Sequence, residues 1–132
     1  MEVVGSGSND VPPEIIIAPP EDGVTMVKNT AVTELQCIGN AKPLHELETV
    51  WLKDGVPIGD AGIPFSFNDL WNRTLSLLQA DFSHEGTYTC QVGMRTGGPR
   101  LTRDTEVRVI GEYRAHRLLS FSISIIFKKF KI

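Results

Sequence analysis

The sequence has little of what membrane spanning, secretion signals or nucleic-acid binding require. No window of about 18 apolar residues exists, so no segment predicts a transmembrane helix. The first ten residues, MEVVGSGSND, lack the cationic stretch and the apolar run of a secretory signal peptide. The net charge is −3, and the basic residues form no stripe. Because nucleic-acid phosphates demand a basic footprint, we expect no nucleic-acid partner.

Catalytic and metal-binding motifs are also missing. Ser83, His84 and Glu85 are consecutive, so they cannot converge from separate segments as a catalytic triad does. His45, His84 and His116 are scattered along the chain. Neither a Cys-x-x-Cys pair nor a His-Glu-x-x-His helix is present to hold zinc. We therefore expect no enzymatic activity, no cofactor, no metal and no small-molecule substrate.

Helical periodicity is scarce as well, and short β-strands explain the pattern better. No segment keeps apolar residues at helical spacing over three turns, whereas Gly and Pro recur throughout. Runs rich in Val, Ile, Thr and aromatic residues alternate with turn-forming stretches such as GNAKP, KDGVP and RTGGPR. The predicted strands are 14–18, 24–27, 31–38, 49–53, 73–79, 87–94 and 105–110. Seven short strands predict an all-β, two-sheet antiparallel sandwich over residues 11–110.

Side-chain direction places both cysteines in the core of this sandwich. Residues two apart in a strand share a face, so the predicted inward residues are Thr33, Leu35, Cys37, Leu75, Leu77, Tyr88, Cys90 and Val92. Two buried cysteines on facing sheets, with Trp51 on a strand between them, can bridge across the core. The alternative is a pair of reduced core cysteines in a cytosolic domain.

The spacing of three motifs resembles the immunoglobulin fold. Cys37 is followed by Trp51 in VWLKDG and then by GTYTC, which ends at Cys90. Tyr88, two residues before Cys90, fits the tyrosine corner of such domains. The prolines before EIIIAPP and the VTMV after it resemble the intermediate set of adhesion proteins. This resemblance implies a Cys37–Cys90 disulfide with Trp51 packed against it.

A closer resemblance is to an N-terminal immunoglobulin domain of the sidekick cell-adhesion proteins. It is carried by PPEIIIAPP, LQCIGNAKPLHELETVWLKDGVPI and RTLSLLQ. It implies an extracellular, non-enzymatic part of a cell-surface membrane protein that recognises a second copy without calcium. Membrane attachment would come from parts of the full-length protein outside this chain. The alternative function is a spacer, in another receptor or in an intracellular muscle-type array.

One position departs from the immunoglobulin pattern. Members usually carry Asp four residues before the corner tyrosine, paired with a basic residue near the start of the fourth strand. Here that position is His84, and the segment GDAGIPFSFND contains no Lys or Arg. We therefore expect both halves of this salt bridge to be lost together. An exposed pair contributes only about 0–1 kcal/mol, so folding need not suffer.

Asn72-Arg73-Thr74 is the one N-glycosylation sequon. Because strand parity points Leu75 and Leu77 inward, Asn72 and Thr74 are expected to point outward. A glycan on Asn72 is therefore predicted if the protein is secreted.

Two surfaces are candidates for protein binding. Loops at one end of the sandwich carry opposite charges, with Glu46 and Glu48 on one loop and Arg95 and Arg100 on the other. These residues form an intermolecular contact or a solvated loop tip.

The second candidate surface is a sheet face, on which we expect Val50, Leu52 and Met94 to point outward. An exposed apolar patch indicates a protein partner, which is a second copy or a neighbouring immunoglobulin domain of the same chain.

The two ends of the chain are expected to lie outside the domain. Residues 1–10 contain GSG and are predicted to be a disordered leader. Residues 111–132, GEYRAHRLLSFSISIIFKKFKI, form a basic and apolar tail with no place in a seven-strand sandwich. Since Gly111-Glu112-Tyr113 can be encoded by a sequence containing an intron start, we interpret the tail as translated intron. The alternative is a segment that lies on an anionic membrane surface.

Overall fold

The structure of this protein is a computed structural model that describes residues 11–30 and 32–111. The predictions for the leader, and for all of the tail after Gly111, lie outside these residues. The strands are β1 (Val11–Ile17), β2 (Val24–Val27), β3 (Thr33–Gln36), β4 (Ile38–Lys42), β5 (Leu47–Lys53), β6 (Val56–Pro57), β7 (Phe65–Phe67), β8 (Thr74–Leu77), β9 (Gly86–Met94) and β10 (Leu101–Ile110). Within the described residues, short 3₁₀ turns lie between the strands: η2 (Leu44–Glu46), η3 (Ile58–Asp60) and η4 (Phe82–His84).

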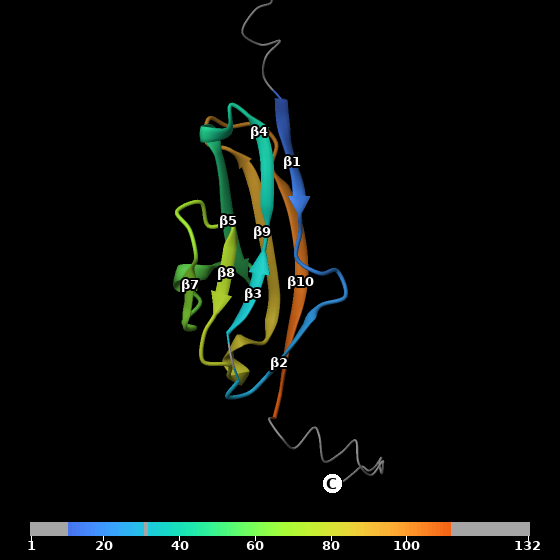
Figure 1. The fold of residues 1–132 in the computed structure, drawn as a ribbon, viewed down its shortest axis with the longest axis vertical. Helices are drawn as coiled ribbons and strands as arrows, with labels where there is room; N and C mark the ends of the chain where they lie inside the picture. The colour runs from blue at the N-terminus through green and yellow to red at the C-terminus, as the bar shows by residue number, and fades with distance from the viewer. Residues whose placement is uncertain (1–10, 31, 112–132) are drawn as a thin grey trace, which may run out of the picture.

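The strands form two layers, which confirms the predicted all-β sandwich (Figure 1). One layer is the five-stranded sheet β2-β10-β9-β5-β6. The other contains β3-β8-β7 together with the pair β1-β4. The N-terminal segment changes layer, since β1 pairs with β4 whereas β2 runs parallel to β10. The described chain enters beside β1 at one end of the sandwich and leaves after β10 at the other (Figure 1).

The core lies between the layers and contains the residues that strand parity pointed inward, except Thr33, which is half-buried. Cys37 and Cys90 are fully buried and joined by a disulfide, which confirms that predicted bond. Trp51 lies directly opposite Cys90 in the β5–β9 register. The other buried apolar residues include Met26, Leu35, Leu47, Leu75, Leu77, Tyr88, Val92, Val107 and Val109. Burial of this apolar surface is the main favourable contribution to folding.

Three segments that were not predicted as strands form them: most of GNAKP, Val56–Pro57 within KDGVP, and Phe65–Phe67. GNAKP, expected to be a turn, contributes most of β4 and pairs with β1. Glycine at position 39 allows the two sheets to pack closely, because a Cβ at this position would lie 2.7 Å from Cγ1 of Val92 on the facing sheet. Phe65–Phe67, which the prediction left out, forms β7 and pairs with β8. All three strands are short and lie beside turn residues, so none contains a sustained apolar alternation.

Candidate functional site

The sequon lies in a turn that the core tryptophan holds in place. Trp51 is 2% exposed, and its Nε1–H donates a hydrogen bond to the main-chain oxygen of Asn72, 2.8 Å away. Asn72 has a φ of 60°, in the left-handed region that asparagine tolerates better than most residues. Its side chain therefore begins from a backbone position that is fixed by the core.

Asp69 closes the same turn from the other side. Its carboxylate accepts hydrogen bonds from the main-chain N–H of Arg73 at 3.1 Å and from the Arg73 Nε–H at 2.6 Å. Burial acts to raise the pKa of Asp69, but these hydrogen bonds outweigh it and hold that pKa below its ordinary value. The ion pair orients the Arg73 side chain on the surface of the sandwich.

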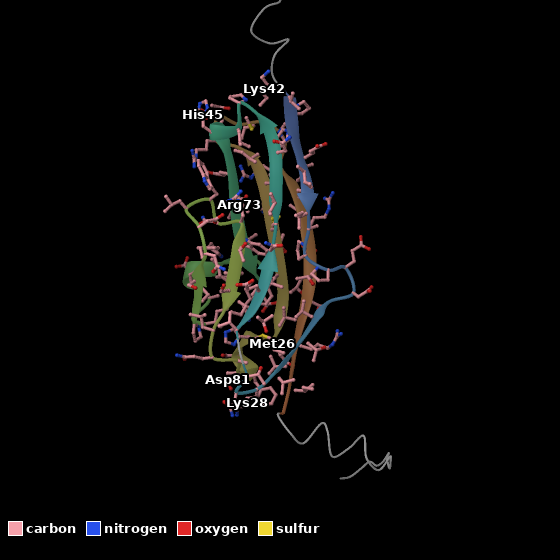
Figure 2. The ribbon with its side chains drawn as sticks, in the orientation of Figure 1. Met26, Lys28, Lys42, His45, Arg73 and Asp81 are labelled. Carbon is pink, nitrogen blue, oxygen red and sulfur yellow. A yellow bond between two sulfur atoms is a disulfide. The ribbon has the colours of Figure 1, made fainter. Side chains whose placement is uncertain are left out.

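A groove of about 370 Å³ opens beside this turn. Figure 2 shows His45 and Arg73 on the same side of the molecule, with Arg73 on the β8 side and His45 at the loop end. We call this cavity the Trp71 groove; its lining residues are Gly39, Asn40, Leu44, His45, Leu47, Thr49, Trp71 and Arg73. It therefore lies where β4, η2 and the start of β5 approach the turn before β8.

Large apolar side chains are exposed around the Trp71 groove. Trp71 is 48% exposed and Leu44 is 58% exposed, although both line it. Leu70, next to Trp71, is 96% exposed. Exposed apolar clusters of this kind mark contacts with a ligand or a partner. Sequence reasoning missed this site; the signal that could have revealed it is Leu70-Trp71 directly before the sequon.

The charged loop residues at one end of the sandwich contact each other within the domain. The Glu48 carboxylate lies 3.7 Å from Nε of Arg95 and 3.2 Å from Nη2 of Arg100. The main-chain N–H of Arg95 also donates to the Glu46 main-chain oxygen at 2.8 Å. Glu48 on β5 thus pairs with arginines in the loop between β9 and β10. Because these charges are paired within the domain, they are less available for an intermolecular contact.

The outer face of the five-stranded sheet carries two of the three residues proposed for it. Val50 and Leu52 alternate with buried Trp51 and are half-buried. The assignment of Met94 to this face was wrong. Met94 shares the parity of Cys90 and Val92 along β9, and it packs against the core. The remaining candidate face therefore consists of Val50 and Leu52, with Gln91 and Thr89 opposite them on β9.

The tyrosine corner is present, with a histidine in place of the usual charged pair. The Tyr88 hydroxyl donates to the main-chain oxygen of His84 at 2.7 Å, and burial raises the pKa of Tyr88. His84 is itself fully buried, and its Nε2 lies 3.1 Å from the Pro64 oxygen. Its Nδ1 lies 3.3 Å from the main-chain N–H of Asp81. A proton on Nε2 lets the ring donate to Pro64 and accept from Asp81. Hydrogen bonds thus replace the lost salt bridge.

A carboxylate also fixes the turn between β5 and β6. Asp54 accepts a hydrogen bond from the main-chain N–H of Thr87 at 2.9 Å and one from Lys53 Nζ at 3.1 Å. The Thr87 bond is the main reason that the pKa of Asp54 is lowered. Gly86 allows this approach, because a Cβ there would lie 2.6 Å from the carboxylate.

The described residues contain neither a metal-binding cluster nor a membrane-spanning helix. Within 11–30 and 32–111, no group of three or more His, Cys, Asp or Glu side chains is placed to hold a metal ion. In the same ranges, no helix has the length and apolar character needed to cross a membrane.

Comparisons with known proteins identify the kind of domain. The chain is 50% identical over 111 residues to Protein sidekick of Drosophila melanogaster, a match that covers 83% of this chain and 5% of that protein. Its fold matches the crystal structure of Sidekick-1 immunoglobulin domains 1–4 with a TM-score of 0.65 and 24% identity, over 78% of this chain and 25% of the other. The chain is an immunoglobulin-like domain that resembles those of sidekick proteins.

Other comparisons show how general the immunoglobulin-like fold is. A chimeric titin Z1Z2 matches with a TM-score of 0.62 and 19% identity, over 78% of this chain and 98% of that one. No protein-family model matches the chain. Because the chain spans only about 5% of its sidekick relative, the activity and partners of the whole protein are proposals.

Proposed function

We propose that this immunoglobulin-like domain is an extracellular adhesion module of a cell-surface protein and that it recognises a second copy through a sheet face. The observation that carries the proposal is the 50% identity to Protein sidekick over 83% of the chain. The Cys37–Cys90 disulfide supports an extracellular location, because disulfides persist in oxidising compartments and are rare in the cytosol.

The outer face of the five-stranded sheet is the proposed recognition surface. Val50 and Leu52 offer apolar side chains on β5, and Leu52 pairs in register with Thr89 on β9 and Pro57 on β6. Apolar side chains surrounded by polar neighbours are typical of a protein interface. Glu48 anchors Arg100 beside this face, where the Arg100 side chain covers Gly93.

A spacer is the second candidate function. The described chain enters and leaves the sandwich at opposite ends (Figure 1), which suits a link in a linear array of domains. The likeness to titin Z1Z2 shows the fold alone and fits this function equally well. A spacer does not have to recognise a second copy. A mutation on the sheet face should therefore leave the function of a spacer unchanged, whereas it should weaken an adhesion module.

Cell aggregation by the full-length protein separates the two candidates. Leu52→Asp would bury an unpaired charge in the proposed interface, which is costly, so we expect aggregation to weaken strongly. Val32→Asp is the control, since Val32 is 50% exposed next to the opposite sheet. If both well-folded variants aggregate cells as the parent does, the sheet face is not the recognition surface. Loss of aggregation in both variants would also contradict it.

A further inference from the structure

We propose that the Trp71 groove holds the first N-acetylglucosamine of a glycan attached to Asn72. The inference rests on the proposed extracellular location, since glycosylation requires passage through the secretory pathway. It does not depend on recognition of a second copy. The groove is thus a carbohydrate site within the domain, filled by the protein's own modification.

The position of the sequon supplies the first argument. Trp71 and Arg73, the two neighbours of Asn72 in the chain, both line the groove. The Asn72 backbone is held by the Trp51 hydrogen bond, and Asp69 holds Arg73. Asn72 does not itself line the groove, but it lies between two residues that do. The attachment point of the sugar is therefore close to the groove along the chain, and little chain entropy is lost if the sugar settles there.

The chemistry of the lining supplies the second argument. A pyranose ring has one face of C–H groups and a rim of hydroxyl and amide groups. Trp71 and Leu44 offer exposed apolar surface for the C–H face, and the negative π-face of an indole attracts such partly positive hydrogens. His45 and Arg73 offer polar groups for the rim. A volume of about 370 Å³ lies at the small end of ligand sites, which suits one sugar.

The exposure of Trp71 supplies the third argument. Asn72 and Thr74 both have structural reasons to be present apart from glycosylation. Asparagine tolerates the positive φ of this turn, and the β-branched side chain of Thr74 suits strand β8. Neither explains a tryptophan that is 48% exposed directly before the sequon. A bound sugar would cover this indole and remove its apolar surface from water.

Attachment follows ordinary N-glycosylation chemistry. The donor is a lipid-linked oligosaccharide diphosphate, and the cell's transferase supplies the catalysis. A bond forms between Nδ2 of Asn72 and C1 of the first N-acetylglucosamine, while the bond from C1 to the diphosphate oxygen breaks. The displaced amide proton is released, and the lipid diphosphate leaves with the electron pair. No oxidant or reductant is needed.

The test compares three glycoforms of the whole chain, secreted from eukaryotic cells behind an added secretion signal. One form keeps the full glycan, and a second is trimmed by an endoglycosidase to a single N-acetylglucosamine. A third is made without sugar in cells treated with an inhibitor of N-glycosylation, so that residue 72 remains asparagine. We expect the first two to melt at about the same temperature and the third to melt about 4 °C lower. The N-acetyl methyl resonance should also be shifted upfield by the indole ring current.

Trp71→Ala identifies the groove as the cause. In this variant the difference between the one-sugar and sugar-free forms should vanish, together with the upfield shift. Thr74→Ala abolishes the sequon while keeping Asn72, whereas Thr74→Ser keeps the sequon and is its matched control. Absence of glycan from Asn72 would overturn the proposal. Equal melting of all three forms, or a difference that survives Trp71→Ala, would also overturn it. These measurements follow the unfolding of the domain and do not require it to bind a second copy. Their outcome therefore does not depend on whether the proposed self-recognition is correct.

Discussion

The Nε1–H of Trp51 donates a hydrogen bond to the main-chain oxygen of Asn72, 2.8 Å away. This contact links the centre of the core, where Trp51 lies opposite Cys90, to the surface turn that carries the sequon. A residue whose size suits the core thus also fixes a potential modification site. Packing and surface function are connected here by one indole ring.

Trp51→Ala is expected to lower the free energy of unfolding by about 3–5 kcal/mol, the range for removing a large buried aromatic side chain. It also leaves the Asn72 carbonyl without its donor. Chemical denaturation followed by circular dichroism measures the effect. A variant within about 1 kcal/mol of the parent would show that Trp51 does not support the core.

Loss of the disulfide should destabilise the domain. Replacing Cys37 and Cys90 together by Ala opens a loop of about 54 residues. The gain in entropy of the unfolded chain should lower the free energy of unfolding by roughly 4 kcal/mol. Denaturant titration of the double variant gives this difference. If the double variant is as stable as the parent, the bridge contributes nothing to the fold.

His84→Leu should lower the free energy of unfolding by about 1–3 kcal/mol, because it leaves the Pro64 oxygen and the Asp81 N–H without the imidazole. Ser83→Ala, at the exposed neighbouring position, should stay within about 0.5 kcal/mol. Thermal melts of both variants decide the point. Equal stability of the two variants would mean that the ring is only a space filler.

The contribution of Asp54 should depend on pH. Its folded-state pKa is lowered, so its stabilising effect is complete above its unfolded value, about 3.9, and is lost as pH falls through the folded value. The melting temperatures of the parent and Asp54→Asn should therefore differ most near neutral pH and converge in acid. A gap that stays constant or widens in acid would contradict the role of the Thr87 hydrogen bond.

Strand periodicity was enough to predict the fold, because alternation in residues such as Leu75 and Leu77 is a local signal that burial preserves. Strand periodicity failed where a segment becomes a strand only because it pairs with a segment far away in the sequence. Gly39 belongs to a strand because β1 pairs with it and Val92 packs close by. Neither relationship is visible in GNAKP itself.

The candidate sites were harder to predict for the same reason. The link from Trp51 to Asn72 depends on where two separated segments meet in the folded chain. The Trp71 groove likewise forms only when η2 and the turn before β8 come together. The error at Met94 was local, because its parity with Cys90 was readable from the sequence.

We propose above that the outer sheet face recognises a second copy. Sedimentation velocity of the domain with its native neighbouring domains tests this claim most directly, with the parent and Leu52→Asp compared over a range of concentrations. We predict that the parent sediments faster as concentration rises, whereas Leu52→Asp remains a monomer with an unchanged circular dichroism spectrum. Identical association by the parent and a folded Leu52→Asp variant, or no association by the parent at any concentration, would contradict the account.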